Sequence, residues 1–232
     1  QYGFDLKKWL MGEDIPPENY LNSCSISLAS IHITQMAYYH LLELNGALDD
    51  TVMSRTIGIT GHSQGIHSAC LSSMRLQGED FYKALSKFVK YYLYSGLVCQ
   101  TCYPIRVVSD ELLAISEKLD RSPPGPMAVV SGLNRLDLQK ILDEYNLTID
   151  ENSHITISLE NTKQILVISA HPEDLLKFRI RNFDLFKTNN INWYYLEITA
   201  PFHSHFMPAG LELFKPDIET IGFQFKGSDL KI

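Results

Sequence analysis

The feature that most constrains this chain is a serine between two glycines, placed where one structural pattern gives way to another. Residues 56–60 form a short β-prone run, Gly61-His62-Ser63-Gln64-Gly65 follows, and a helical pattern then continues to about Leu76. A serine on a tight strand-to-helix turn projects its hydroxyl into solvent, and flanking glycines let the backbone make such a turn. The pattern therefore predicts that Ser63 is a nucleophile; a purely structural turn is the alternative.

The helix that follows Ser63 is expected to provide a hydrogen-bond donor for the reaction. Its N-terminus is expected to lie beneath the serine, where the backbone N–H of Gln64 can donate a hydrogen bond to an oxyanion. In an extended chain neighbouring side chains point to opposite sides, so His62 is expected to point away from Ser63. We therefore expect His62 to line or support the site rather than to act as the base.

Two helical patterns surround this motif. Residues 20–44 are typical of a long buried helix that ends at Asn45-Gly46, and His32 and His40 within it are expected to be packing residues. A later helix places five apolar side chains at helical spacing, and nothing in that spacing requires a functional role for them. These core positions are Phe81, Leu85, Phe88, Val89 and Tyr92.

The clearest linker is Ser122-Pro123-Pro124-Gly125-Pro126, after which the pattern changes. Strands are predicted at 127–130, 155–159, 165–168 and 193–198, and helices at 136–145 and 172–178. The order β-α-β-β-α-β is that of a ferredoxin-like unit. The sequence therefore predicts a small lobe at 126–199, inserted into an α/β core formed by residues 1–125 and 200–232.

Composition excludes several classes of protein. Hydrophobic residues make up 45% and charged residues 20% of the 232, as in ordinary globular proteins, and the net charge of −7 argues against nucleic-acid or anionic-membrane partners. No apolar run approaches the roughly 18 to 20 residues that span a bilayer. Cys99 and Cys102 have C-x-x-C spacing without a second ligand pair. We expect unreactive thiols in a reducing cytoplasm and no metal, with a redox or metal role as the alternative.

A base for Ser63 must come from among eight histidines, and the best placed lies in Ala200-Pro201-Phe202-His203-Ser204-His205, directly after the last predicted strand. This segment and the Ser63 motif together resemble the acyltransferase domains of type I fatty acid synthases, above all the acetyltransferase domain of the fungal-type β chain. Residues 2–5, 8–10, 25–38 and 157–169 are also similar, so that the resemblance covers nearly the whole chain.

The resemblance implies an α/β-hydrolase-like large lobe with an inserted ferredoxin-like lobe, and a Ser–His dyad without a carboxylate. His203, helped by a backbone carbonyl, would take the Ser63 proton, and His205 would be its neighbour in the motif. Ser63 would attack an acyl-CoA thioester, and the phosphopantetheine thiol of an acyl carrier protein would then accept the acyl group. No permanently bound cofactor is implied. Phe202 and Asn161, in the matching stretches, are expected to line the substrate site.

Residue 95 bears on which acyl group is transferred. Malonyl-selective members of the family carry an arginine in the second helix after the motif, where its fork pairs with the malonyl carboxylate. Ser95 stands at that place, and no arginine lies between Phe81 and Tyr103. Because burying an unpaired carboxylate costs several kcal/mol, acetyl or another small neutral group is predicted, and malonyl is the alternative.

The family's glycine-glutamine-glycine loop, which gives the second oxyanion donor, precedes the region where this chain begins, and its closing helices follow Ile232. The core is therefore expected to be incomplete at both ends and to belong to a larger synthase, whose other domains are partners. Two other functions remain open. An esterase or thioesterase shares the serine motif but needs an acid between the serine and a late histidine. An inactive carrier-docking domain would need no chemistry.

Overall fold

The computed structural model describes residues 3–223, which form two compact units. The first contains residues 3–98 and 212–223, and the second contains residues 99–211. The second unit is wider than the lobe predicted at 126–199, because the chain on either side of that lobe belongs to the same unit. In the part of the chain described, no helix combines the length and apolarity needed to cross a membrane.

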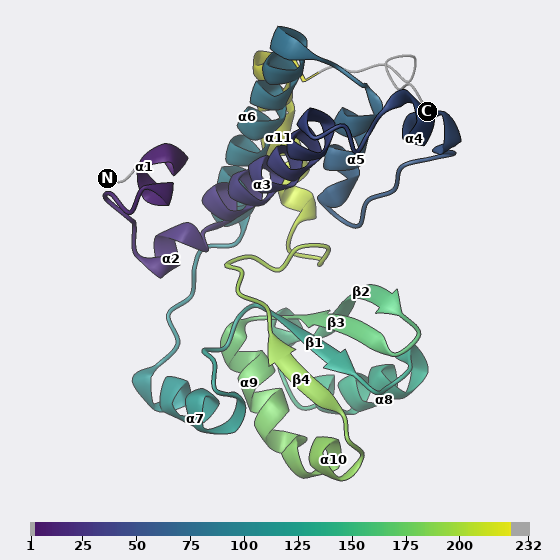
Figure 1. Cartoon of the computed structure of the whole chain (residues 1–232). Helices are drawn as coiled ribbons and strands as arrows, with labels where there is room; N and C mark the ends of the chain where they lie inside the picture. Colours follow the sequence, from purple (N-terminus) through teal and green to yellow (C-terminus); the bar gives the residue numbers. More distant parts are fainter. Residues whose placement is uncertain (1–2, 224–232) are drawn as a thin grey trace. The chain divides into compact units, whose positions relative to one another are not determined.

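The first unit is helical (Figure 1). Its longest elements are α3 and α6, and α5 begins directly after the Ser63 motif. The elements of this unit are α1 (Leu6–Leu10), α2 (Glu18–Leu21), α3 (Cys24–Leu44), α4 (Asp50–Arg55), α5 (Gly65–Ser73), most of α6 (Gly78–Cys102) and most of α11 (Pro208–Ile221).

The strand predicted at 56–60 does not form. These residues connect α4 to the Ser63 motif without regular secondary structure, and Ile57 is 100% exposed. A strand exists only through hydrogen bonds to a neighbouring strand. Within residues 3–223 the only sheet lies in the second unit, so β-prone composition alone does not make this run a strand.

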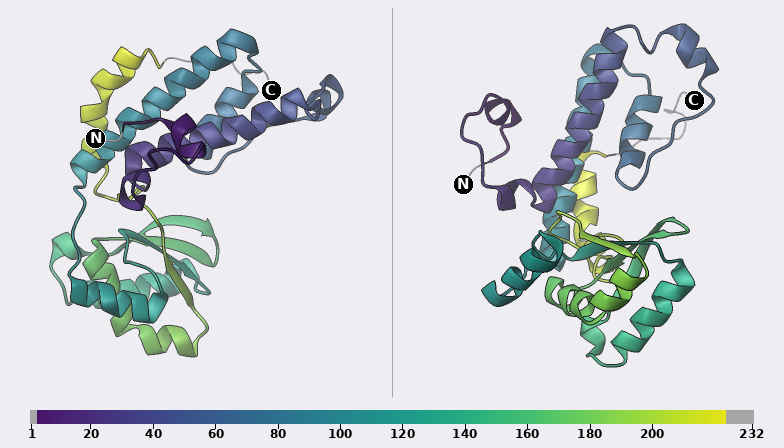
Figure 2. Two further views of the ribbon diagram at one scale, coloured as in Figure 1. Left: turned by 60° about the vertical axis from the view of Figure 1, so that its left-hand side comes forward. Right: turned by 60° about the horizontal axis from the view of Figure 1, so that its bottom comes forward.

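Helices α3, α5 and α6 share the core of the first unit. Met36 from α3, Leu71 from α5 and Phe88 from α6 are each about 1% exposed and belong to one apolar cluster. Along α6, Tyr92 is also buried, as the helical spacing predicted. Helix α11 lies along α6 (Figure 2), where Phe214 packs edge-on against Tyr91 with 5.1 Å between ring centroids.

A glycine sets how closely α3 and α6 approach. A β-carbon on Gly96 would overlap the backbone of Ser25 at the start of α3. The two helices therefore touch backbone to backbone at this point, which only a residue without a side chain permits. The neighbouring residue Ser95 therefore lies where α6 packs directly on the start of α3.

The second unit contains the sheet. It begins with the last turn of α6 and the linker to α7, and it includes a short 3-10 turn, η1. Its elements are α7 (Asp110–Asp120), β1 (Met127–Ser131), α8 (Arg135–Asn146), η1 (Glu151–Ser153), β2 (Thr156–Thr162), β3 (Ile165–Ser169), α9 (Pro172–Arg181), α10 (Phe183–Thr188) and β4 (Asn192–Tyr195).

The four strands are antiparallel in the order β2-β3-β1-β4. With α8 between β1 and β2 and α9 between β3 and β4, this is the ferredoxin-like βαββαβ unit that the sequence predicted. Strand β4 ends at Tyr195, three residues before the predicted end, and α10 was not anticipated.

The two faces of the sheet are covered differently. Ala128 and Val130 point to the face covered by α8, α9 and α10, where the largest apolar cluster of this unit lies (Figure 1). Met127 and Val129, which alternate with them, point to the opposite face. A buried ion pair between Arg179 of α9 and Asp120 at the end of α7, with nitrogen–oxygen distances of 2.9 and 3.1 Å, fixes α7 against α9.

Candidate functional site

The Ser63 motif forms a tight turn at the start of α5. The Gly65 N–H donates to the His62 carbonyl at 2.9 Å, which closes the turn. Ser63 lies at its tip with φ 51°, in the left-handed region that costs a non-glycine residue on the order of 1–3 kcal/mol. Its side chain is exposed. The strained residue is therefore the serine itself, which is typical of a nucleophile on a sharp turn.

The two glycines of the motif have different roles. A β-carbon on Gly61 would overlap the carbonyl group of Gly65, whereas a β-carbon on Gly65 would meet nothing within 4 Å. Neither glycine has a positive φ. Gly61 therefore allows the close approach of two peptide groups in the turn, and Ser63 carries the backbone strain.

Gln64 lies between Ser63 and the first residue of α5. Its backbone N–H has no hydrogen-bond acceptor within residues 3–223, as expected for one of the first donors of a helix. Its carbonyl accepts the hydroxyl of Tyr92 at 2.8 Å, and its side-chain amide reaches the Leu28 carbonyl at 3.5 Å. Residue 64 thus contacts both α3 and α6, and its N–H remains available to an oxyanion.

Tyr92 continues this contact to α5, because the Nδ1 atom of His67 lies 2.7 Å from the Tyr92 hydroxyl oxygen. Burial raises the pKa of Tyr92 and lowers the pKa of His67, so both side chains are neutral near pH 7. The sequence placed Tyr92 only among core residues. The signal that could have found this role is chemical, because a buried tyrosine hydroxyl requires a hydrogen-bond partner.

A second buried polar group joins α5 to α3. The Ser68 hydroxyl donates to the Gln35 side chain at 2.5 Å and lies 2.8 Å from Nδ1 of His32. His32 is fully buried, and this burial lowers its pKa to about 4, with His67 as a lesser cause. Its Nε2 has no partner among the described residues. His32 is thus a neutral packing residue, as the sequence predicted.

Two further predicted residues lie in the first unit. His62 is exposed, and its carbonyl closes the turn, so its backbone supports the motif. Ser95 is half-buried on α6, one turn after Tyr92, and its hydroxyl donates to the Tyr92 carbonyl at 3.2 Å. The structure therefore brings Ser95 to the helix that contacts Gln64.

The second predicted motif also forms a turn. Ala200 and Pro201 are buried, and the buried Ser204 hydroxyl donates to the Pro201 carbonyl, which closes the turn around His203. His203 is exposed with φ 60°, so it has the same left-handed conformation as Ser63. His205 is also exposed and packs on the ring of Phe206, with 4.0 Å between ring centroids.

Phe202 and Asn161 lie in the second unit. Phe202 packs with Met127, Val129 and Val167 on the face opposite α8 and α9. Asn161 is exposed on β2, at a bulge where Glu160 pairs with Leu166 and Thr162 pairs with Ile165, so that Asn161 is the extra residue. Bulges redirect side chains and are frequent next to active sites.

The predicted residues thus divide between the two units. Ser63, Gln64, His62 and Ser95 lie in the first unit, on the turn before α5 and on α6. The other predicted residues lie in the second unit, on β2 and on the turn after β4; they are His203, Phe202 and Asn161.

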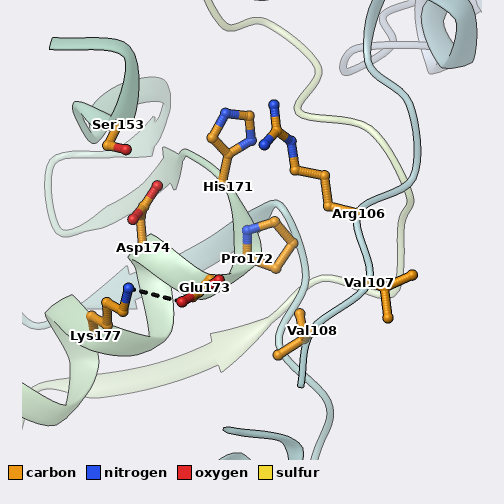
Figure 3. Close-up of a pocket in the computed structure, with 9 residues that line it drawn as sticks. All are labelled: Arg106, Val107, Val108, Ser153, His171, Pro172, Glu173, Asp174 and Lys177. Carbon is orange, nitrogen blue, oxygen red and sulfur yellow. Dashed lines mark ion pairs between the residues drawn. The ribbon is translucent and has the colours of Figure 1, made fainter. Parts of the chain in front are cut away.

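A separate cavity of about 440 Å³ lies in the second unit at the start of α9 (Figure 3). Lys177 and Glu173 form an ion pair across 2.8 Å, Arg106 lies beside the His171 ring, and Asp174 points toward Ser153. Burial, and then the Arg106 charge, lower the pKa of His171. None of the predicted site residues lines this cavity. The residues that line it are Arg106, Val107, Val108, Ser153, His171, Pro172, Glu173, Asp174 and Lys177.

The four cysteines were considered for a redox or metal-binding role. All four are thiols, and Cys99 and Cys102 lie half-buried at the end of α6. Among residues 3–223, no group of three or more His, Cys, Asp and Glu side chains is arranged to hold a metal ion. The chemistry that this geometry offers is therefore that of the serine turn, with an N–H donor beside it.

Comparison with known families identifies the family of this chain. A family model described as starter unit:ACP transacylase in aflatoxin biosynthesis matches residues 11–203. Similar curated proteins are the fatty acid synthase beta subunit TOXC of Cochliobolus carbonum, 28% identical over 94% of this chain, and the fatty acid synthase subunit beta of Saccharomyces cerevisiae, 26% identical over 99% of it. The chain spans only 11% and 12% of the length of these relatives.

Solved structures give the same fold. FabD from Acinetobacter baumannii superposes with a TM-score of 0.60 at 18% identity, covering 94% of this chain and 56% of that one. A malonyl-transacylase solved in complex with a type II polyketide synthase acyl carrier protein gives 0.57 at 17% identity, covering 92% of this chain and 59% of that one. The α/β acyltransferase fold with a ferredoxin-like lobe, expected from the sequence, is confirmed.

Proposed function

This chain belongs to the starter unit:ACP transacylase family, and on that basis we propose that it transfers a small acyl group from coenzyme A to an acyl carrier protein in fatty acid or polyketide synthesis. The observation that carries the proposal is the conformation of Ser63. Its exposed side chain stands on a strained turn directly before α5, beside the unused N–H of Gln64. A hydrolase would share this serine turn, and the family match is what favours transfer over hydrolysis.

The reaction follows from these groups. The Ser63 oxygen attacks the thioester carbonyl while His203 accepts the hydroxyl proton, and the Gln64 N–H donates to the oxyanion that forms. The carbon–sulfur bond then breaks, and His203 returns the proton to the departing coenzyme A thiolate. In the second half, His203 takes the proton of the phosphopantetheine thiol, whose sulfur attacks the Ser63 ester. Collapse of that intermediate releases the acylated carrier and reprotonates Ser63.

Acetyl, or another small neutral acyl group, is the substrate that fits residue 95. The half-buried Ser95 brings a short hydroxyl rather than a cation to α6. A carboxylate of a malonyl group would be desolvated there without a charged partner, which costs several kcal/mol.

The carrier partner follows from the second half-reaction, because the acyl group must leave Ser63 on a thiol. Coenzyme A brings the group and a phosphopantetheine arm accepts it, so no resident cofactor is required. One structural neighbour was solved together with an acyl carrier protein, which supports such a partner for this chain. The great length of the fungal relatives supports further synthase domains as neighbours.

The test is intact-mass spectrometry of the complete protein after separate incubation with acetyl-CoA and malonyl-CoA. We expect a gain of one acetyl group, mapped to Ser63 and lost in the Ser63→Ala variant. Addition of a carrier protein should move the group to the carrier thiol. Release of free acetate without transfer would instead identify a hydrolase. Labelling of Ser63→Ala at the wild-type level would exclude the mechanism.

A further inference from the structure

The hydroxyl of Tyr92 makes two hydrogen bonds that the reaction outlined above does not use. It donates to the Gln64 carbonyl at 2.8 Å, and it lies 2.7 Å from Nδ1 of His67. A carbonyl can only accept, so the single phenolic proton is committed to Gln64. His67 must therefore donate its Nδ1 proton to the Tyr92 oxygen, and this requirement fixes both its tautomer and its ring orientation.

These bonds lie inside the first unit and are not weakened by ionisation near neutral pH. Tyr92 is 2% exposed and His67 is half-buried. Burial opposes the charged form of each, so it raises the pKa of Tyr92 and lowers the pKa of His67. The chain from His67 through Tyr92 to the Gln64 carbonyl therefore consists of neutral groups with a single arrangement of protons.

These hydrogen bonds matter for the reaction because they end at Gln64, next to Ser63. Ser63, directly before it, has φ 51°, a conformation that neighbouring contacts must maintain. The Gln64 carbonyl also accepts the first bond of α5, from the His67 N–H at 3.0 Å. Two groups thus hold the carbonyl of residue 64, and the N–H of the same residue is the donor proposed above for the oxyanion.

We propose that Tyr92 is a positioning residue for acyl transfer: its hydroxyl, oriented by His67, holds Gln64 so that the backbone N–H meets the developing oxyanion. The inference rests on the proposed function and adds to it two residues that touch neither substrate nor the reacting atoms. An oxyanion donor is effective only within a few tenths of an ångström of its best position, so loss of support behind it lowers the rate without changing substrate affinity.

The test compares two variants on the same helix. Tyr92→Phe removes the hydroxyl and keeps the ring in the core. Tyr82→Phe is the matched control, because Tyr82 also lies on α6 and its hydroxyl also contacts a histidine, His40, at 3.3 Å. In single-turnover acylation of the complete protein by acetyl-CoA, we expect Tyr92→Phe to lower the rate at saturation about tenfold with an unchanged KM. Tyr82→Phe should match the wild type.

A spectroscopic readout separates positioning from mere packing. With an acetyl group labelled with ¹³C at the carbonyl, the infrared band of the Ser63 ester reports the hydrogen bond that its oxygen receives. In Tyr92→Phe the band should shift to higher frequency and broaden, because the Gln64 N–H is less well placed. A band identical to that of the wild type would show that Tyr92 only fills space.

Two substitutions at His67 test whether its Nδ1–H is the group that orients the Tyr92 hydroxyl. The Nδ2 of an asparagine occupies nearly the place of the histidine Nδ1 and can donate the same bond, whereas leucine cannot. His67→Leu should therefore slow acylation as much as Tyr92→Phe does, and His67→Asn should retain most of the rate. Equal loss in both variants would overturn the role of the Nδ1–H.

The two hypotheses fail in different ways. If the wild-type protein gains no acyl group at Ser63, the proposed function falls and this inference falls with it. If the wild type is acylated at Ser63 and Tyr92→Phe reacts at the same rate with the same carbonyl band, only the positioning role of Tyr92 is refuted.

Discussion

The carbonyl group of Gly65 occupies the space where a β-carbon of residue 61 would lie. This contact folds the motif so that the peptide groups on either side of Ser63 face each other, and the Gly65 N–H bonds to His62. The turn requires that Gly61 come close to the Gly65 carbonyl. It does not require a positive φ at either glycine. A single methyl group at residue 61 would disturb this contact.

A matched pair of alanine substitutions tests this contact. Gly61→Ala should overlap the Gly65 carbonyl and force the turn open, which we expect to cost about 1–3 kcal/mol of unfolding free energy and about a hundredfold in acylation rate. Gly65→Ala meets no atom within 4 Å and should leave thermal stability unchanged. Denaturation curves and acylation rates of both variants provide the measurement. Equal destabilisation by both would contradict this explanation.

The two histidines after β4 should behave differently. We expect His203→Ala to slow acylation of Ser63 by about 10²–10⁴, the usual contribution of a general base. His205 packs on Phe206, so His205→Ala should leave the rate within severalfold of the wild type. Rapid-quench acylation kinetics on both variants give the comparison. The opposite ranking would transfer the role of base to His205.

Acyl selectivity should respond to residue 95. Replacing the half-buried Ser95 by arginine adds a guanidinium that can pair with a carboxylate through two parallel hydrogen bonds. The Ser95→Arg variant should lose acetyl transfer and gain malonyl transfer, shifting the ratio of the two kcat/KM values by about a hundredfold or more. Ser95→Ala, which adds no charge, is the control and should remain selective for acetyl. Malonyl transfer by the wild type at the rate of acetyl would remove the basis of this prediction.

Stability should fall in mild acid because His32 is buried in its neutral form. Its pKa is about 4 in the folded protein, against 6.5 in an unfolded chain, so the unfolded state binds protons first as pH decreases. The stabilisation is fully present above pH 6.5 and is lost between pH 6.5 and 4, amounting to about 3 kcal/mol. Urea unfolding across this range measures it. His32→Asn keeps a donor for Ser68 and should flatten the curve, leaving the slope due to His67; an unchanged curve would be evidence against the assignment.

The ferredoxin-like unit was predictable from the sequence, because short apolar strands and helical patterns follow one another in the order β-α-β-β-α-β after a proline-rich linker. The prediction failed at residues 56–60, where β-prone side chains such as Ile57 lack a partner strand among the described residues. The hydrogen bonds of Tyr92 were also missed. Helical spacing identifies a core position, but only the fold shows that its hydroxyl reaches the carbonyl of residue 64 from 28 positions away.

Gly96 has a consequence for how a protein of this kind can diversify. Its close packing on the Ser25 backbone allows a short distance between α6 and α3 that does not depend on the side chain at the neighbouring position 95. A change of residue 95 therefore alters one side chain without altering the frame that holds it. New substrate preferences can then arise through single substitutions at this helix position, and the serine turn need not be rebuilt each time.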